Sequence, residues 1–369
     1  MNVNGETVLR ICFIVNEIFH WGAYGGFGAL TRTIGSELVK KGFEVCVLMP
    51  KASKDQRTIE HLDGMTVIGM PSWKSSFFYE LCEADVYHGE DPSIGAYYAQ
   101  KKNRNAKHII TFQDPRTVEE DKMSIWALNP RWKKYRYRAT MEVKLKIGDF
   151  MVKKAVHNAD QLTCQAKYII PKTVSMFQLK KPPSFLPNPV EVPEKTIKKA
   201  KDPTVLFLGR WDPVKRVELF FELAKKFSNV RFIAAGAAHD QVRDEYLRKE
   251  YAGVPNLEMP GLVFGKQKYD LLEQAWVLIN TSTRECLPVS FLEAAAYKCA
   301  ILSSNNPDSF AENFGYYTKD ENYENGLHTI LQDDLWRERG MRGYEYVKET
   351  HELNRVIDQH ANLYKEIVE

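Results

Sequence analysis

The stretch from Trp276 to Ser304 places an apolar strand, a short polar loop, a helix and a second apolar strand in direct succession. The helix is predicted to begin at the Leu287-Pro288 step, because proline suits the first helical position, where its missing N–H costs nothing. Two strands joined by a helix run parallel in one sheet. This stretch therefore predicts an α/β unit whose loops at the carboxyl ends of the strands can hold a ligand.

Two glutamates lie in this stretch, Glu285 on the loop after the first strand and Glu293 within the first turns of the helix. The backbone N–H groups of Val289 and Ser290 have no acceptor inside the helix, and they carry the positive end of its dipole. Such a helix end binds phosphate. A carboxylate one turn deeper can accept hydrogen bonds from ribose hydroxyls. We interpret the stretch as a nucleotide-binding element; an ordinary amphipathic helix with a solvent-facing acid is the alternative.

The same alternation of strands and helices runs through the rest of the chain. In the first half, a helix is predicted at 29–41 and strands at 8–15, 43–49, 65–69, 85–88 and 108–112. In the second half, strands are predicted at 204–208, 230–235, 276–280 and 300–304, with helices between them. The chain after Thr318 is predicted to be helical, at 321–331, 334–349 and 351–366. The alternation predicts two α/β units, each with a mostly parallel sheet covered by helices on both faces.

A proline-rich segment separates the two units. Five prolines fall within residues 182–193, too many for a helix or a central strand. We predict a first domain over 1–187, a linker over 188–203, a second domain over 204–349 and a final helical segment over 350–369. The final helix can either cross back to the first domain or cap the second.

Length and composition agree with two globular domains. A chain of 369 residues with 44% hydrophobic residues is longer than the chains that usually fold around a single hydrophobic core. No apolar run approaches the ~18 residues of a membrane span, and the first residues do not form a signal peptide, so we expect a cytoplasmic protein. The six cysteines form no C-x-x-C pair and mostly lie in apolar patterns. We expect all of them to be reduced thiols.

Positive charge is concentrated in the first half of the chain. Residues 1–190 contain 27 Lys and Arg against 19 Asp and Glu, whereas residues 191–369 contain 24 against 29. The stretch 131–138 alternates three aromatic residues with five cations, and the basic character continues through Lys144, Lys146, Lys153 and Lys154. Such a stretch suits an anionic partner, and we expect peripheral membrane contact through 131–154 rather than nucleic acid; a solvated helix face is the alternative.

The stretch from Ser282 to Ala296 resembles the E-x7-E signature of family 4 retaining glycosyltransferases, which have the GT-B fold. The second domain opens with Leu208-Gly-Arg-Trp-Asp-Pro-Val-Lys215, which resembles the GR-x(n)-K element of that family. The resemblance implies two facing Rossmann-like parallel-sheet domains with a helical carboxyl-terminal extension. It also implies transfer of a sugar from a nucleotide diphosphate-sugar to a hydroxyl acceptor, with retention of configuration.

The resemblance implies a role for each residue that matches a family motif. Glu285 would orient the sugar hydroxyls, while Arg210 and Lys215 would stabilise the leaving diphosphate. The other implied donor-binding residues are Gly25 and Gly26 of a glycine-rich loop, Gly209, Gly236, Val263, Leu287, Val289, Ser290 and Glu293. Contacts to the sugar or the acceptor are expected from His88, Gln113 and Asp114, and a histidine hydrogen-bonded inside the fold is the alternative for His88.

Several positions depart from the family pattern. Gln113 stands where many relatives have a histidine, and Cys286 stands where a glycine usually follows the first glutamate. Arg216 replaces the glycine that commonly follows the lysine, and residues 298–300 replace Gly-x-Pro. These departures leave open a catalytically weak GT-B binding module, and a nucleotide-sugar epimerase or hydrolase of the same architecture is the other alternative.

We expect neither a resident cofactor nor a metal. The chain has no Asp-x-Asp pair that would hold a cation on the diphosphate. A UDP-sugar is the expected donor. GDP- and ADP-sugars remain alternatives, because recognition of the base by backbone groups leaves no side-chain signature. An anionic or lipid-linked hydroxyl acceptor would suit the basic stretch.

Overall fold

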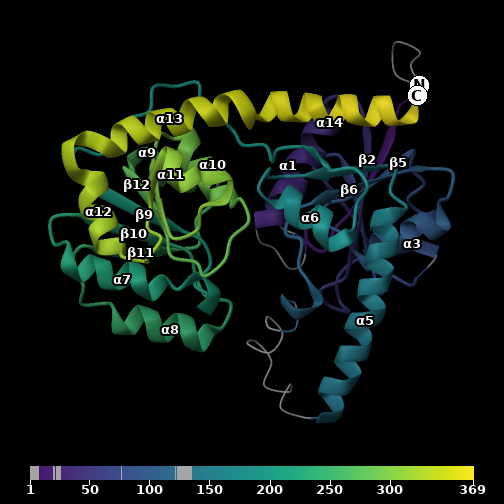
Figure 1. The fold of residues 1–369 in the computed structure, drawn as a ribbon, viewed down its shortest axis with the longest axis horizontal. Helices are drawn as coiled ribbons and strands as arrows, with labels where there is room; N and C mark the ends of the chain where they lie inside the picture. Colours follow the sequence, from purple (N-terminus) through teal and green to yellow (C-terminus); the bar gives the residue numbers. More distant parts are fainter. Residues whose placement is uncertain (1–7, 20, 22–25, 76, 121, 123–134) are drawn as a thin grey trace. The chain divides into compact units, whose positions relative to one another are not determined.

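The computed structural model describes the whole chain except residues 1–7, 20, 22–25, 76, 121 and 123–134. The chain divides into two compact units (Figure 1). Unit 1 comprises Met1–Asn188 and Val356–Glu369, and unit 2 comprises Pro189–Arg355. No helix among the described residues is long and apolar enough to cross a membrane.

Unit 1 is built on an eight-stranded sheet with the order β3-β4-β2-β1-β5-β6-β7-β8. Neighbouring strands are parallel except for the β3–β4 pair. The strands are β1 (Arg10–Ile14), β2 (Glu44–Pro50), β3 (Ile59–Leu62), β4 (Met65–Met70), β5 (Val86–Gly89), β6 (Lys107–Phe112), β7 (Gln161–Cys164) and β8 (Ser184–Phe185). The helices of this unit are α1 (Gly26–Lys40), α2 (Phe77–Glu80), α3 (Ile94–Lys102), α5 (Tyr135–His157), α6 (Ile169–Phe177) and, from Val356 onward, α14 (Leu353–Val368).

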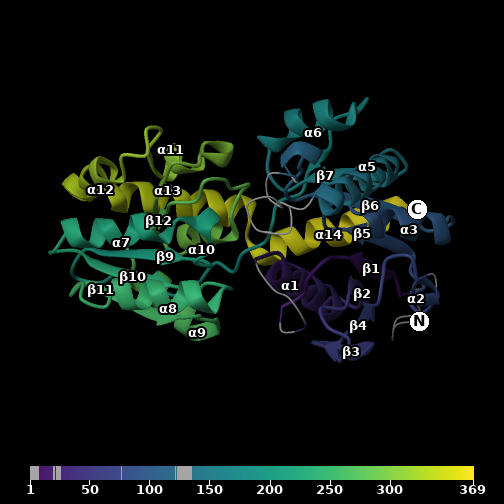
Figure 2. The ribbon, with the colours of Figure 1, turned by 90° about the horizontal axis from the view of Figure 1, so that it is seen from below.

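Unit 2 has a six-stranded, wholly parallel sheet with the order β11-β10-β9-β12-β13-β14. The strands are β9 (Thr204–Leu208), β10 (Arg231–Ala235), β11 (Leu257–Gly261), β12 (Val277–Asn280), β13 (Ala300–Ser303) and β14 (Gly315–Tyr317). The helices are α7 (Val217–Lys226), α8 (Gln241–Glu250), α9 (Gly265–Gln274), α10 (Val289–Ala296), α11 (Phe310–Phe314), α12 (Tyr323–Leu331) and α13 (Leu335–Thr350), with 3-10 turns η2 (Pro213–Lys215), η3 (Pro307–Ser309) and η4 (Gln332–Asp334). Helices cover both faces of the sheet, with α8 on one side and α12 on the other (Figure 2).

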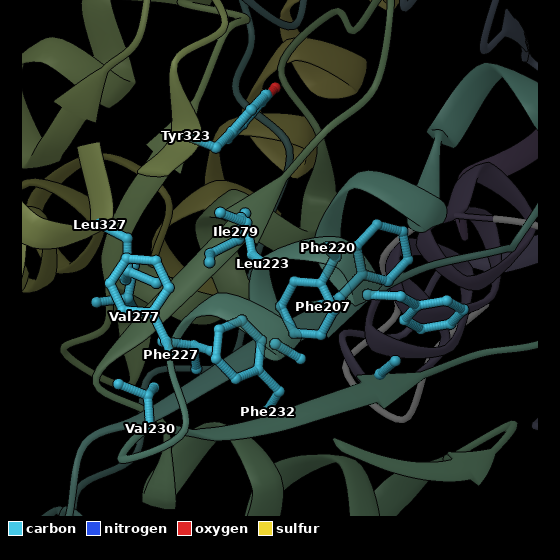
Figure 3. Close-up of a cluster of buried hydrophobic side chains, with 14 of the residues drawn as sticks. Phe207, Phe220, Leu223, Phe227, Val230, Phe232, Val277, Ile279, Tyr323 and Leu327 are labelled. Carbon is cyan, nitrogen blue, oxygen red and sulfur yellow. The ribbon is translucent and has the colours of Figure 1, made fainter. Parts of the chain in front are cut away.

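Aromatic side chains fill one side of the core of unit 2. Figure 3 shows Phe207 of β9, Phe220 of α7 and Phe232 of β10 close together in this cluster. The rings of Phe220 and Phe232 meet edge to face with centroids 5.1 Å apart, a favourable arrangement for aromatic pairs. The apolar face of α7 thus fixes this helix on the strands whose ends carry the candidate site.

The predicted fold class, two parallel-sheet α/β units with a helical carboxyl-terminal extension, is confirmed. Every strand predicted from the sequence is present, within a few residues of its predicted bounds. The strands that were not predicted (β3, β7, β8, β11 and β14) either contain polar residues, glycine or proline among the apolar ones or have only two or three residues, so they show no clear apolar run.

The predicted linker packs with unit 2 in the structure, from Pro189 onward. The indole N–H of Trp276 donates to the carbonyl of Ala200 at 2.9 Å, and the N–H of Ala200 donates to the carbonyl of Gln274 at 3.1 Å. Lys195 pairs with Glu273 at 2.5 Å. Residues 189–203 are therefore anchored on unit 2, although their composition suggested a separate linker.

The expectation that all six cysteines are reduced is wrong for two of them. Cys46 of β2 and Cys82, after α2, form a disulfide across 36 positions of sequence. Cys12, Cys164, Cys286 and Cys299 are free thiols. Cysteine spacing could not reveal the pair, because Cys46 and Cys82 meet only when the elements that carry them pack in the apolar cluster that also contains Cys12 and Tyr79.

Candidate active site

The carboxyl ends of β9 and β12 lie where the strand order of unit 2 reverses. β9 pairs with β10 on one side and with β12 on the other. Ligands of open parallel sheets bind beyond the carboxyl ends of the strands at such a reversal. Arg210 and Lys215 lie on the loop after β9, and Glu285 lies on the loop after β12. Three of the predicted residues therefore border this point.

Lys215 and Glu285 form an ion pair between these two loops. Lys215 Nζ lies 2.6 Å from Glu285 Oε1, and the side chains are only 23% and 10% exposed. The same oxygen accepts hydrogen bonds from Ser282 Oγ at 2.6 Å and from Asn280 Nδ2 at 3.0 Å. The N–H of Glu285 donates to Asn305 Oδ1 at 3.1 Å. These contacts hold the carboxylate in one orientation.

Arg210 contacts different residues from those that contact Lys215. Its Nε lies 3.3 Å from Asp212 Oδ2, and one terminal nitrogen lies 3.5 Å from His239 Nδ1. The side chain is 43% exposed. Its guanidinium can therefore reach a ligand, but it takes no part in the Lys215–Glu285 contact.

Helix α10 begins at Val289, three residues after the Glu285-Cys286 step, with Pro288 as its N-cap. The sequence suggested the first helical position for Pro288, and the structure places it one residue earlier. Leu287 is buried and anchors the loop. The first amides of the helix, those of Val289 and Ser290, have no acceptor within an α-helix, so they can serve an anion at this end.

Glu293 lies one turn into α10 and pairs with a lysine that the sequence did not single out. Lys268 Nζ of α9 lies 2.6 Å from Glu293 Oε1, and the side chains are 22% and 17% exposed. A carboxylate has about four lone-pair positions, so Glu293 can hold Lys268 and still accept hydrogen bonds from hydroxyl groups.

Two glycines at the strand ends lie too close together for any side chain. Gly236, after β10, has φ +154°, and a Cβ added there would come within 1.8 Å of the carbonyl oxygen of Gly209. Both conditions require glycine. The N–H of Gly236 donates to the carbonyl of Gly261 at 2.8 Å, two residues before the buried Val263. The backbone is therefore closely packed beside the loop of Arg210, where Gly209, Gly236 and the segment of Val263 meet.

Two of the departures from the family pattern keep the backbone that glycine favours. Arg216 has φ +47° and Lys298 has φ +60°, both in the left-handed region. Arg216 is compensated by side-chain bonds, because its guanidinium pairs with both carboxylate oxygens of Glu321 at 2.9 and 2.6 Å and donates to the carbonyl of Thr281 at 2.8 Å. The backbone course at these positions is thus retained without glycine.

Unit 1 contains a cavity of about 620 Å³ at the reversal of its own strand order. The cavity lies at the carboxyl ends of β1, β5 and β6, and helix α5 supplies part of its wall. Among the described lining residues, the carboxylates are Glu17, Glu90, Asp91, Asp114 and Asp149, and the cations are Arg116 and Lys144. The wall therefore has an excess of acidic groups, interspersed with apolar side chains.

Glu90 and Asp91, after β5, are the most perturbed groups of this cavity. Burial raises the pKa of each carboxyl to about 7. Glu90 Oε2 accepts a hydrogen bond from the hydroxyl of Thr31, whereas Oε1 is buried with no partner among the described residues. Asp91 Oδ1 accepts from the N–H of Gln113 at 3.2 Å. A perturbed carboxyl with an unused acceptor in a cavity is a candidate binding group.

Gln113 and Asp114 line the same cavity, and both have partners within unit 1. The amide of Gln113 exchanges two hydrogen bonds with the amide of Asn188, at 3.1 and 3.0 Å. Asp114 Oδ2 accepts two hydrogen bonds from Arg116, at 2.8 and 2.6 Å. Gln113 therefore fixes the end of β6 with a neutral amide pair, where many relatives have a histidine.

His88 lies in the core of unit 1, which corresponds to the alternative interpretation of this residue. Its side chain is 1% exposed, and its ring nitrogens bond to the hydroxyls of Tyr364 and Thr111, each at 2.7 Å. Burial lowers its pKa to about 3. A ring enclosed in this way cannot contact a substrate, so we do not retain His88 as a site residue.

The glycine-rich loop is described only in part. Gly25 lies outside the described residues, and Gly26 is the first residue of α1, where a Cβ would meet nothing within 4 Å. The space at Gly26 is compatible with a ligand near the amino end of α1, but packing does not require glycine there.

Several residues of the two sites were missed by the sequence reasoning. Asn280, Ser282 and Asn305 hold Glu285, and their only signal was a position at a strand end. Glu90 and Asp91 stand in the segment that drew attention to His88, and their signal was an acidic pair directly after a buried strand. Lys268 had no signal, because its contact with Glu293 depends on the packing of two helices.

Comparisons with known proteins agree with this architecture. A family model described as glycosyl transferases group 1 matches residues 191–331. A search of curated proteins finds no match. Among solved structures, sucrose-phosphate synthase from Thermosynechococcus elongatus is similar with a TM-score of 0.74 and 16% identity, over 97% of this chain and 99% of that chain.

Two further solved structures cover nearly the whole chain. A glycosyltransferase from Rickettsia africae is similar with a TM-score of 0.68 and 14% identity, over 99% of this chain and 100% of that chain. HepE of Anabaena, solved with UDP-glucose, has a TM-score of 0.71 and 10% identity, over 97% of this chain and 100% of that chain. These similarities show that the chain has the GT-B fold, as the sequence predicted.

Proposed function

We infer that the chain is a glycosyltransferase, from the premise that residues 191–331 form a group 1 glycosyltransferase domain within a GT-B fold. The finer proposal is a retaining transferase that moves a hexosyl group from a nucleotide diphosphate-sugar to a hydroxyl acceptor. The observation that carries it is the Lys215–Glu285 pair beside the amino end of α10, at the strand reversal of unit 2.

The chemistry of the donor follows from the charges at this point. Negative charge builds on the diphosphate as the sugar departs, and preorganised cations and amides stabilise it. An ammonium group has three donors, so Lys215 can keep Glu285 and also donate to a phosphate oxygen. Arg210 can bind two oxygens at once, and the amides of Val289 and Ser290 add the helix end. Glu293 would accept hydrogen bonds from the ribose.

Glu285 would orient the hydroxyls of the transferred sugar. Its Oε1 already accepts from Lys215, Ser282 and Asn280, so this oxygen is a poor nucleophile. We propose that the leaving phosphate takes the proton of the acceptor hydroxyl, which is compatible with retention. We also propose that the cations replace a metal on the diphosphate; transfer that is unchanged by a chelator is the expected result.

The cavity of unit 1 favours a transferase over an epimerase or hydrolase, because neither of these needs a separate acceptor site. Its acidic wall suits a neutral, hydroxyl-rich acceptor group, since carboxylates accept hydrogen bonds from hydroxyls. HepE was solved with UDP-glucose, and we propose a UDP-sugar as the donor here. We also propose that the acceptor is lipid-linked. The exposed surface of α5, described below, is relevant to this proposal.

The test is thermal unfolding with UDP, GDP, ADP and their sugar conjugates, on the wild type, Arg210→Ala and Lys215→Ala. A nucleotide at 100 times its dissociation constant should add about 2.7 kcal/mol of stability to the wild type, and most of this gain should be absent in Lys215→Ala. Arg231→Ala is the matched control, because Arg231 starts β10 at the opposite end of the strand and pairs with Glu258.

No stabilisation by any nucleotide would contradict a donor site in unit 2. Once a donor is known, NMR of the product separates the mechanisms. Transfer to an acceptor with the anomeric configuration of the donor is expected, whereas release of free sugar alone would favour the hydrolase.

A further inference from the structure

Helix α5 presents a continuous apolar stripe on its outer face. Val143, Ile147 and Phe150 are 57%, 51% and 64% exposed. Positions four and seven residues apart lie on the same face of a helix. Single exposed apolar residues are ordinary, but a row of three large ones on one helix face marks an interaction surface.

Lysines border this stripe, and acids lie away from it. With 3.6 residues per turn, Lys154 falls in line with Val143, and Lys146 falls beside Phe150. The two acids of α5, Glu142 and Asp149, lie roughly a quarter turn or more from the stripe and pair with Arg138 and Lys153 at 3.1 and 2.8 Å. No ion pair among the described residues engages Lys146 or Lys154. The outer face therefore combines apolar side chains with positive charge.

The inner face of the same helix belongs to the cavity of unit 1. Leu145, Gly148 and Val152 line the cavity together with Lys144 and Asp149. Figure 1 shows the amino-terminal part of α5 extending away from the sheet of unit 1. One helix thus has its inner face in the proposed acceptor cavity and its outer face in solvent.

We propose that the outer face of α5 docks on an anionic lipid bilayer, so that unit 1 receives an acceptor presented at the membrane surface. The apolar stripe would enter the boundary between headgroups and acyl chains, and the lysines would remain among the anionic headgroups. Lysine side chains are suited to this because their stems are apolar and their charged ends reach the interface.

The apolar stripe distinguishes a bilayer from nucleic acid. Nucleic acid is bound by cations with polar groups and flat aromatic rings, a role open to Phe150, but it offers nothing to the exposed aliphatic side chains of Val143 and Ile147. Residues 131–134 of the basic stretch lie outside the described residues, and the side chains of 135–137 are not described, so the docking surface is defined by residues 138–154. The acceptor part of the proposal rests on the proposed function, whereas binding to the bilayer does not.

The experiment is co-sedimentation of the full chain, without donor or acceptor, with vesicles of phosphatidylcholine alone and of phosphatidylcholine mixed with phosphatidylglycerol. We expect binding to the mixed vesicles that weakens as salt is raised. Lys146→Glu/Lys154→Glu should bind at least about tenfold more weakly, because each lost lysine removes attraction and each new acid is repelled. Val143→Ser/Ile147→Ser/Phe150→Ser should also bind at least about tenfold more weakly.

Two control variants carry matched changes on unit 2. Val242→Ser/Tyr246→Ser removes two side chains of α8 that are 77% and 61% exposed, on a helix with three cations and three acids. Lys201→Glu/Lys249→Glu reverses two exposed lysines outside α5. Both controls should bind like the wild type. Melting temperatures and the nucleotide-induced shift should be unchanged in every variant, which excludes misfolding.

Three results would overturn the proposal. The first is equal binding of the wild type to neutral and anionic vesicles, or binding to neither. The second is unchanged binding in the α5 variants. The third is retention of single-stranded or duplex oligonucleotides that is lost in the lysine variant while vesicles remain unbound, which would indicate a nucleic-acid surface. Vesicle binding without any nucleotide-induced shift would refute the glycosyltransferase and leave the docking surface standing.

Discussion

Individual side chains in the two sites differ in how firmly their neighbours hold them. Glu285 is held by Lys215, Ser282 and Asn280, so its carboxylate is an oriented group. Glu90 has one hydrogen-bond donor and one unused oxygen in a buried position. The first arrangement suits precise placement of a sugar, whereas the second leaves a protonation state that depends on pH.

A substitution at Glu90 should change the pH dependence of stability. Burial raises its folded-state pKa to about 7 from the ordinary glutamate value of 4.5. The folded state therefore holds a proton that the unfolded state loses between these values, and wild-type stability falls as pH rises through this window. Glu90→Gln keeps the shape and removes the charge. Its free energy of unfolding should exceed that of the wild type by up to about 3 kcal/mol at pH 8, and the gain should vanish near pH 4.

The measurement is urea unfolding of both proteins across this pH range. Burial lowers the pKa of His88 to about 3 and that of His360 to about 4, and it raises the pKa of Asp91 to about 7. These groups are present in both proteins, so the difference between the two curves isolates Glu90. Glu349→Gln, at an exposed position of α13, is the matched control and should follow the wild type at every pH. A constant difference between the Glu90→Gln variant and the wild type would show that this carboxyl does not titrate near neutrality.

At the scale of elements, the strand–loop–helix order of unit 2 could be predicted because its strands are short continuous apolar runs ended by glycine or polar residues. The Glu285 loop and α10 are consecutive in sequence, so their order alone indicated a site. The contacts of Lys268 and Asn305 could not be predicted, because they join segments that are distant in sequence. The left-handed backbone of Arg216 and Lys298 was hidden for another reason, since side-chain identity normally argues against it.

The disulfide between Cys46 and Cys82 joins β2 to the segment after α2. Its presence can be tested by the number of cysteines that react with an alkylating reagent. Alkylation of the denatured, unreduced protein should label four of the six cysteines, and peptide mapping should identify Cys46–Cys82. Mapping matters because the sulfur of Cys12 lies within 4.8 Å of both partners. Closing a loop of 36 positions should contribute about 3–4 kcal/mol by the chain-entropy model.

Reduction of the protein, followed by urea unfolding, tests that contribution. Cys164→Ser is the matched control, because it removes a buried thiol of the same unit that is not in the disulfide. Labelling of all six cysteines without reductant would contradict the pairing.

At the scale of the whole molecule, the chain leaves unit 1 after Asn188 and returns to it at Val356. The returning segment is amphipathic and buries Val356, Ile357, Ala361 and Tyr364 in unit 1. Its sequence pattern predicted a helix but not which unit it covers, because an apolar helix face fits either α/β unit. The contact that decides this, His88 with Tyr364, joins residues 276 positions apart.

Truncation after Arg355 should therefore destabilise unit 1 and spare unit 2. Burial of a large apolar side chain stabilises by about 1.5–3 kcal/mol, so the loss of Val356, Ile357 and Tyr364 together should cost unit 1 about 5 kcal/mol or more. The hydroxyl of Tyr364 adds to this, because its removal leaves His88 Nδ1 buried without its partner.

Hydrogen exchange of the β1 and β5 amides reports on unit 1, and the nucleotide-induced shift reports on unit 2. Tyr364→Phe should reproduce a small part of the loss, and Lys365→Ala/Glu366→Ala, on the exposed side of the same helix, should reproduce none of it. Unchanged protection of β1 and β5 in the truncated chain would show that unit 1 is complete without α14.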